Sequence, residues 1–378
     1  MKTMLIFGTR PEAIKMAPVI ARMKREKLKT VVCVTAQHRE MLDQVLKIFR
    51  IQCDYDLNVM RPSQDLFSLS AATLTGLKRI LAKERPDMVL VQGDTTTAFI
   101  GGLAAFYLKI PVGHVEAGLR THNKYSPFPE EINRRLLSTI ADIHFAPTEW
   151  ARSNLLKEGV AASKIFVTGN TVVDALLEIQ QRQKTKSAHE AWNRYFFKSW
   201  NIVIPEKITD KKIILVTGHR RENFGKSFRD ICFALKKIAL SRKDAVIVYP
   251  VHLNPNVQQP VNSILSGIEA IRLIRPLDYE PFIYLMGRAH LILTDSGGIQ
   301  EEAPSLGKPV LVMRDTTERP EGIEAGVVKL VGSDKERIVR AAMKLMDDPR
   351  AYKRMSNAIN PYGDGKSAGR IVKVLRGL

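Results

Sequence analysis

The chain has 378 residues, 45% of them apolar, which suits two domains with ordinary cores and excludes a largely disordered chain. No apolar run reaches the roughly 18 residues that a membrane span needs, so no membrane association is expected. Three cysteines without a CxxC pair argue against a disulfide framework or a zinc site and favour the reducing cytoplasm.

The net charge of +19 raises the alternative of nucleic-acid binding. No RNP-like aromatic pattern, zinc finger or basic zipper accompanies the charge. A small anionic substrate is therefore the favoured interpretation, and no nucleic-acid partner is predicted.

Short runs rich in Val, Ile and Leu alternate with amphipathic stretches, of which 64–84 is the clearest helix. The runs lack polar alternation, which is typical of parallel strands buried on both faces. The predicted strands are 3–7, 30–35, 87–91, 111–115, 143–146, 165–168, 212–217, 245–250, 271–274, 290–294, 309–312 and 327–331.

This alternation predicts the α/β class, with two doubly wound Rossmann-like domains facing a central cleft. The segment 180–212 begins with a polar stretch without periodicity, and a new strand and glycine turn follow it. We therefore predict an N-terminal domain over 1–180, a linker region over 181–211 and a C-terminal domain over 212–378. The last helix could return to the first domain.

Ligands of such sheets bind beyond the carboxyl ends of the strands. After the first strand, Arg10 and Lys15 flank a helix start, which suits either an anion site or a plain turn with exposed basic residues. After later strands come Asp94, which alone is best interpreted as a helix cap, and Glu116, which has no capping role.

Glu130 opens a helix, where an acid complements the helix dipole and can pair with Arg134. A functional role is favoured because Asp94, Glu116 and Glu130 are all expected to project to one rim of the predicted sheet. Three carboxylates near Arg and Lys indicate acid/base chemistry on an anionic substrate.

The second half repeats the pattern of strand, turn and basic residues. His219 follows a strand and could contact a phosphate or cap a helix. Ser296 is the predicted N-cap of a helix in which Gly297 and Gly298 let a ligand approach the bare amides, and an acid one turn on could bind a ribose.

Two weaker patterns are set aside. Gly365-Lys366-Ser367 resembles the end of a P-loop but lacks the upstream glycine and strand. His114 and Glu116 have metal-ligand spacing, but no third ligand stands at a suitable distance in the chain, so no metal is predicted.

Taken together, these blocks closely resemble the non-hydrolysing UDP-N-acetylglucosamine 2-epimerase family. The resemblance extends from Phe7–Lys15 to Asn360–Gly365 and is most specific at Val91–Thr97, His114–Arg120, Thr217–Glu222 and Thr316–Glu321. It implies a GT-B fold, interconversion of UDP-GlcNAc and UDP-ManNAc for surface polysaccharide, no cofactor, and a homodimer activated by UDP-GlcNAc at an allosteric site.

The resemblance also assigns residues. It implies catalytic roles for Asp94, Glu116, Glu130 and His219. It implies substrate contacts for Arg10, Lys15, Arg134, Leu277, Phe282, Ser296, Gly297, Gly298, Glu302 and Arg319, where the backbone near Leu277 and Phe282 meets uracil and Glu302 meets the ribose.

The activator positions of some members correspond to Gln37, Arg220 and His252. Glu40 and Ser63 stand where those members have Gln and Arg, which argues against an identical activator site. Two other enzymes share parts of this pattern: a GT-B glycosyltransferase, and a hydrolysing epimerase that releases free ManNAc and UDP.

Overall fold

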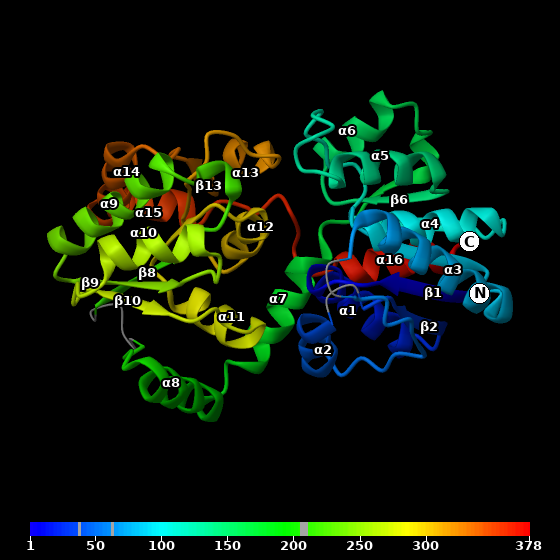
Figure 1. The fold of residues 1–378 in the computed structure, drawn as a ribbon, viewed down its shortest axis with the longest axis horizontal. Helices are drawn as coiled ribbons and strands as arrows, with labels where there is room; N and C mark the ends of the chain where they lie inside the picture. Colours follow the sequence, from blue (N-terminus) through cyan, green and yellow to red (C-terminus); the bar gives the residue numbers. More distant parts are fainter. Residues whose placement is uncertain (37–38, 62–63, 205–210) are drawn as a thin grey trace. The chain divides into compact units, whose positions relative to one another are not determined.

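The computed structural model describes residues 1–36, 39–61, 64–204 and 211–378. The chain divides into two compact units (Figure 1). Unit 1 comprises Met1–Ala175 and Tyr362–Leu378, and unit 2 comprises Leu176–Pro361. No helix in these described ranges is long and apolar enough to cross a bilayer.

Unit 1 contains a seven-stranded parallel sheet in the order β3-β2-β1-β4-β5-β6-β7. The order reverses at β1, which creates the switch point beyond whose strand ends ligands bind in such sheets. The strands are β1 (Lys2–Phe7), β2 (Lys29–Val34), β3 (Tyr55–Asp56), β4 (Met88–Gln92), β5 (Val112–Val115), β6 (Ile143–Ala146) and β7 (Ile165–Val167).

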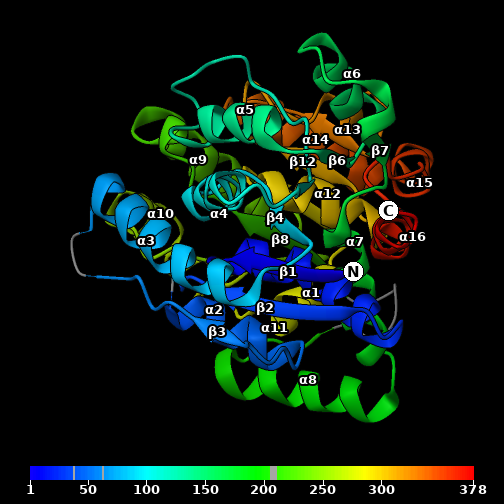
Figure 2. The same cartoon turned by 90° about the vertical axis from the view of Figure 1, so that its right-hand side faces the viewer.

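Helices cover both faces of this sheet, because a parallel sheet buries both faces. Helices α3, α4 and α5 pack side by side, and α1 packs with α2 and α16 (Figure 2). The unit-1 helices are α1 (Arg10–Arg25), α2 (Arg39–Ile48), α3 (Leu66–Glu84), α4 (Thr96–Tyr107), α5 (Glu130–Ile140), α6 (Glu149–Lys157), η1 (Ala162–Lys164) and α16 (Ser367–Arg376).

Unit 2 contains a six-stranded parallel sheet in the order β10-β9-β8-β11-β12-β13. Its order reverses at β8, so the ends of β8 and β11 form the corresponding switch point. The strands are β8 (Lys212–Thr217), β9 (Ala245–Pro250), β10 (Ile271–Ile274), β11 (Leu291–Thr294), β12 (Val310–Val312) and β13 (Val328–Leu330).

Helix α7 (Thr171–Arg182) runs from the end of unit 1 into unit 2. In unit 2, α9 packs with α10 and α14. The unit-2 helices are α8 (Lys186–Trp200), η2 (Arg221–Asn223), α9 (Lys226–Ser241), α10 (Pro255–Leu265), α11 (Tyr279–Arg288), α12 (Gly297–Ser305), α13 (Pro320–Glu324), α14 (Lys335–Asp347) and α15 (Pro349–Ser356).

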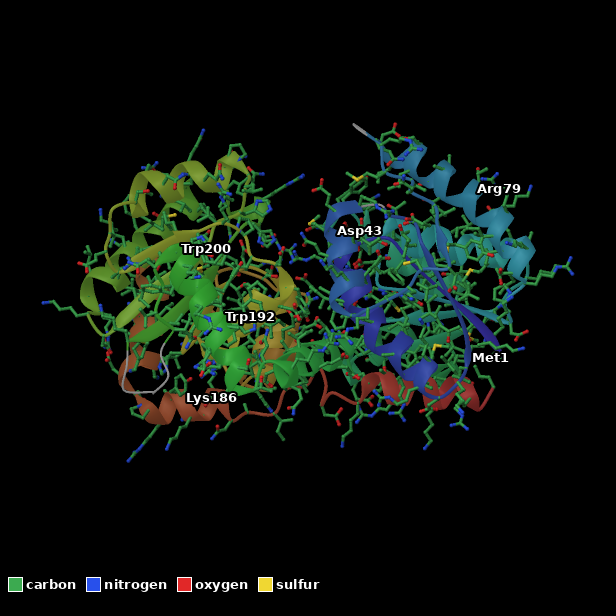
Figure 3. All side chains as sticks on the ribbon, turned by 90° about the horizontal axis from the view of Figure 1, so that it is seen from below. Met1, Asp43, Arg79, Lys186, Trp192 and Trp200 are labelled. Atoms are coloured by element: carbon green, nitrogen blue, oxygen red, sulfur yellow. The ribbon has the colours of Figure 1, made fainter. Side chains whose placement is uncertain are left out.

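The predicted α/β class with two parallel sheets is confirmed, and all the predicted strands are present with ends shifted by at most one residue. The region predicted as a linker contains α8, along which Lys186, Trp192 and Trp200 lie (Figure 3). Trp192 stacks on Tyr284 of α11, with ring centroids 5.9 Å apart. Packing of aromatic side chains thus stabilises α8. This helix was not identified from the sequence because its first residues are polar and show no apolar periodicity.

Candidate active site

Glu116 is the most buried of the three predicted carboxylates in unit 1 and follows β5 directly. Its backbone has a φ of 64°, a left-handed conformation that non-glycine residues rarely adopt. The carboxylate accepts hydrogen bonds from Lys15 Nζ at 2.6 Å, from Asn170 Nδ2 at 2.8 Å and from Gln92 Nε2. An ammonium and two amides thus orient both oxygens, and the unusual backbone is of the kind that clusters at functional sites.

Asp94 follows β4, the neighbouring strand. Its carboxylate forms an ion pair with Arg134, and its backbone carbonyl accepts a hydrogen bond from Asn133 Nδ2 at 3.0 Å. Thr95, not Asp94, caps α4, because its hydroxyl accepts the hydrogen bond from the backbone of Ala98 at 3.0 Å. The alternative that Asp94 only caps the helix is therefore wrong.

Glu130 is half-buried and begins α5, the helix that also carries Asn133 and Arg134. The loops after β4 and β5 touch as well, since a Cβ on Gly93 would lie 3.5 Å from Glu116 Oε2. The structure therefore brings the segments that carry Asp94, Glu116 and Glu130 to one edge of the unit-1 sheet.

The start of α1 contains a carboxylate of its own, Glu12. One of its oxygens accepts hydrogen bonds from the backbone of Gly8 at 3.1 Å and of Thr9 at 2.8 Å. Burial raises the pKa of Glu12 to about 7, and these hydrogen bonds only partly oppose it. Because Glu12 occupies these amides, an anion at this turn would meet the side chains of Arg10 and Lys15 instead.

In unit 2, His219 follows β8 and lies beside the fully buried Asp295 at the end of β11. The ring nitrogen Nδ1 of His219 is 3.3 Å from Asp295 Oδ1. Burial lowers the pKa of His219, and the Asp295 carboxylate opposes that shift. His219 caps neither following helix, because Arg220 is the N-cap of η2 and Gly225 that of α9, so the capping alternative for His219 is wrong.

Helix α12 begins with the predicted cradle. Ser296 is its N-cap, as predicted, but its side chain makes no capping hydrogen bond. Gly297 and Gly298 form the first turn, so the residues of this helix start have no side chains of their own to shield the backbone amides. The helix dipole and these amides suit a diphosphate.

Arg319, another predicted substrate contact, is buried among acidic residues. Its guanidinium pairs with Glu301, and its Nη1 lies 3.0 Å from Glu318. Burial alone would raise the pKa of Glu318, but Arg319, Arg314 and Arg220 lower it to about 2. The network therefore stays ionised at neutral pH and fixes Arg319 beside the start of α12.

The remaining nucleotide positions lie on neighbouring elements. Glu302 is buried in α12 and accepts a hydrogen bond from the hydroxyl of Tyr279 at 3.1 Å. Leu277 lies in the loop between β10 and α11, and Phe282 lies in the first turn of α11. These positions extend from the α12 start toward the end of β10.

Of the residues matched to an activator site, Gln37 lies outside the described residues, as does Ser63. His252 stacks on His219, with ring centroids 5.4 Å apart. Arg220 Nη2 lies 3.9 Å from Glu318. Glu40 lies in the first turn of α2.

Sequence reasoning missed five polar residues that support the site: Gln92, Asn170, Asp295, Glu301 and Glu318. Three of them could have been noticed. Gln92, Asn170 and Asp295 follow predicted strands, so the rule that ligands bind beyond strand ends applies to them too.

Comparison with known proteins identifies the family. The family model described as UDP-N-acetylglucosamine 2-epimerase matches residues 21–376. The UDP-N-acetylglucosamine 2-epimerase of Escherichia coli strain K12 is 58% identical, over 100% of this chain and 98% of the relative. The enzyme of that name from Campylobacter jejuni is 55% identical, over 99% and 97%.

Comparison with solved structures leads to the same family. The crystal structure of a UDP-GlcNAc 2-epimerase from Neisseria meningitidis bound to UDP-GlcNAc is 50% identical, with a TM-score of 0.92 and full coverage of both chains. The Methanocaldococcus jannaschii structure in complex with UDP-GlcNAc and UDP is 36% identical, with a TM-score of 0.81 and full coverage. These matches confirm the predicted GT-B class of two Rossmann-like domains. The chain belongs to the UDP-N-acetylglucosamine 2-epimerase family.

Proposed function

We propose that this chain interconverts UDP-GlcNAc and UDP-ManNAc by eliminating UDP to give 2-acetamidoglucal and then adding it back. The observation that carries the proposal is the edge of unit 1 where Asp94, Glu116 and Glu130 gather. There Lys15, Gln92 and Asn170 hold Glu116. The names of the E. coli and N. meningitidis relatives support the same reaction.

The order of bond breaking follows from the chemistry of the sugar. C2 bears no adjacent carbonyl, so its proton is not acidic and direct removal is costly. Breaking the C1–O bond first makes the C2 proton far more acidic and places negative charge on the departing UDP. The enzyme therefore has to stabilise a diphosphate as it leaves.

Unit 2 supplies the nucleotide contacts in this proposal, except for that of Arg10, which belongs to unit 1. The start of α12 offers amides and the positive end of a helix dipole to the diphosphate. His219 and Arg10 add side chains for the developing charge, Glu302 binds the ribose, and the loop around Leu277 receives the uracil. Groups that are already in place act without reorganisation when the charge appears.

In this proposal, carboxylate side chains of unit 1 transfer the protons. One carboxylate removes the C2 proton, and another group returns a proton to the opposite face, which gives the epimer. Inversion through two faces needs two acid/base groups, and Asp94, Glu116 and Glu130 provide them. A glycosyltransferase would have no use for three such carboxylates.

Incubation of the purified protein with UDP-GlcNAc alone tests the proposal. We expect UDP-ManNAc, detected by NMR of the intact nucleotide sugar, and the same equilibrium mixture from either starting sugar. A glycosyltransferase makes no UDP-ManNAc under these conditions, and a hydrolysing epimerase releases free ManNAc and UDP. Either result would refute the proposal.

We further propose that the enzyme is a homodimer that UDP-GlcNAc activates, and that its product supplies surface polysaccharide. Large apolar side chains are exposed on neighbouring helices of unit 1: Phe67 on α3 is 87% exposed and Phe106 on α4 is 57% exposed. Such exposure suits a subunit contact. Phe106→Glu should halve the mass measured by light scattering, whereas Ile359→Glu, a control on unit 2, should not.

A further inference from the structure

Asn170 contacts Glu116 from the loop after β7, a segment that carries none of the predicted site residues. It follows β7, is 2% exposed and donates a hydrogen bond from Nδ2 to Glu116 Oε1 at 2.8 Å. Its other side-chain atom, Oδ1, accepts a hydrogen bond from the backbone of Val172 at 3.1 Å, at the start of α7. The two ends of one amide therefore serve a helix and a proposed acid/base carboxylate.

We propose that Asn170 is a positioning residue that fixes the direction of the Glu116 carboxylate and favours its ionised form. The inference rests on the proposed function, in which Glu116 moves a proton. Donation of a hydrogen bond to a carboxylate stabilises the charged form. Lys15 supplies the neutralising charge, while the amides of Asn170 and Gln92 fix the two oxygens from different strand ends.

The C-terminal segment of unit 1 holds Asn170 in place. The backbone N–H of Asn170 donates to the carbonyl of the buried Tyr362 at 2.6 Å. Gly169, with a φ of 83°, has no room for a side chain, since a Cβ there would lie 2.6 Å from Ser367 Oγ. The last turn before α16 thus locks the loop that presents Asn170 to Glu116.

A role in capping alone does not account for this arrangement. The cap uses only an oxygen, and Asp or Ser at such a position serves as well as Asn. The nitrogen of Asn170 is what reaches Glu116. The cap and the contact with Glu116 can therefore be separated by one substitution.

Asn170→Asp keeps an oxygen for Val172 and replaces the N–H donor with a second carboxylate against Glu116. The charged or titratable groups near Glu116 then include Lys15, the buried His114 on β5 and the new Asp. A like charge raises the pKa of Glu116. The acidic limb of the kcat/KM profile for epimerisation should therefore move to higher pH by about one unit or more. Because Glu116 also loses the donor that fixes its direction, kcat at pH 7 should be about tenfold lower or worse.

A matched control is available at the start of α10, where Asn254 Oδ1 accepts a hydrogen bond from the backbone of Asn256 at 2.9 Å. Asn254→Asp makes the same change at a cap in unit 2, where the backbone of Asn254 contacts His252 rather than Glu116, so the acidic limb should stay in place. UDP affinity, measured by calorimetry, should be unchanged in both variants. If Asn170→Asp does not fold, Asn170→Ser keeps a capping oxygen and should lower kcat more than it changes KM.

The outcomes separate the two proposals. If the wild-type protein forms no UDP-ManNAc, the proposed function fails. If the wild type is active and Asn170→Asp retains its pH profile and kcat, Asn170 only caps α7 and the inference is overturned. If Asn170→Asp does not fold, the same result for Asn170→Ser overturns the inference.

Discussion

The guanidinium of Arg319 occupies the space that a side chain on Gly297 would need. A Cβ built on Gly297 would lie 2.5 Å from Arg319 Nη1 and 2.9 Å from its Cζ. Arg319 is 9% exposed and bound to Glu301 and Glu318, so it has little freedom to move aside. The first glycine of the cradle is therefore required by the protein itself, before any ligand binds.

Gly297→Ala should displace Arg319 from its buried acidic partners and destabilise unit 2 by about 1–3 kcal/mol, in the usual range for overpacking. Thermal denaturation measures the effect. Gly298→Ala is the matched control, because its Cβ would only reach an ordinary contact of 3.8 Å with Glu302. Equal stability of the two variants would contradict the close approach of Arg319 to Gly297.

Asp295 controls both the backbone and the charge of His219. Its Oδ2 accepts hydrogen bonds from the backbone N–H groups of His219 and Arg220, both at 2.8 Å. The substitution Asp295→Asn retains an oxygen for these amides but removes the negative charge. Because that charge raises the pKa of His219 against burial, Arg220 and His252, the substitution should lower that pKa further.

If charged His219 stabilises the departing diphosphate, the alkaline limb of the kcat profile of Asp295→Asn should move to lower pH. At pH 8 we expect kcat to fall about tenfold or more, which corresponds to ~1.4 kcal/mol. Thermal stability measured in parallel separates this effect from unfolding. An alkaline limb that stays in place would show that His219 does not act in its protonated form.

Glu116→Gln should abolish proton transfer while leaving the nucleotide contacts of unit 2 intact. An amide cannot carry a proton to or from carbon, so we expect kcat to fall about 1000-fold or more, a barrier increase of ~4 kcal/mol. UDP affinity should remain close to that of the wild type. Steady-state kinetics and calorimetry measure the two quantities.

Glu84→Gln is the control for Glu116→Gln, since Glu84 also pairs with a lysine, Lys2, at 2.6 Å but lies at the end of α3. It should keep wild-type activity. Glu116→Gln activity within tenfold of the wild type would exclude Glu116 from the acid/base set.

Glu12 makes the stability of unit 1 depend on pH. Burial raises its pKa from 4.5 to about 7, so its contribution to stability is fully present below pH 4.5 and is lost as the pH rises through 7. The lost contribution is on the order of 3 kcal/mol. Glu12→Gln removes this titration, so its unfolding free energy relative to the wild type should increase by that amount between pH 4.5 and pH 8.

Urea denaturation followed by the fluorescence of Trp150 measures this difference. Trp150 is the one tryptophan in unit 1, so Trp192→Phe and Trp200→Phe make it a reporter of that unit. If the unfolding free energies of the wild type and Glu12→Gln change in parallel between pH 4.5 and pH 8, Glu12 is ionised throughout this range in the folded protein. That result would contradict the prediction.

The strands were predictable because uninterrupted Val, Ile and Leu runs bounded by turns are typical of buried parallel strands. Strand β3 and helix α8 are among the elements that were not predicted. Strand β3 has only two residues, Tyr55–Asp56, too few to show a pattern. Helix α8 begins in a polar stretch, although Thr185 at its N-cap and Asn201 at its C-cap, with a φ of 52°, are ordinary end signals.

The site was predictable where a residue had no local structural role, as with Glu116. Strand ends also point to Asn170 and Asp295, but the sequence does not show which distant residue each of them contacts. Asn170 is 54 residues from Glu116, and Asp295 is 76 residues from His219. Such pairs depend on the order of the strands in the sheet, and single-strand patterns do not contain that information.

Turnover of UDP-GlcNAc in deuterium oxide tests the elimination mechanism most directly. A proton removed from C2 by a carboxylate exchanges with solvent before another group delivers a proton to the opposite face. NMR and mass spectrometry of the isolated UDP-ManNAc should therefore show deuterium at C2. UDP-ManNAc formed with only hydrogen at C2 would contradict the account.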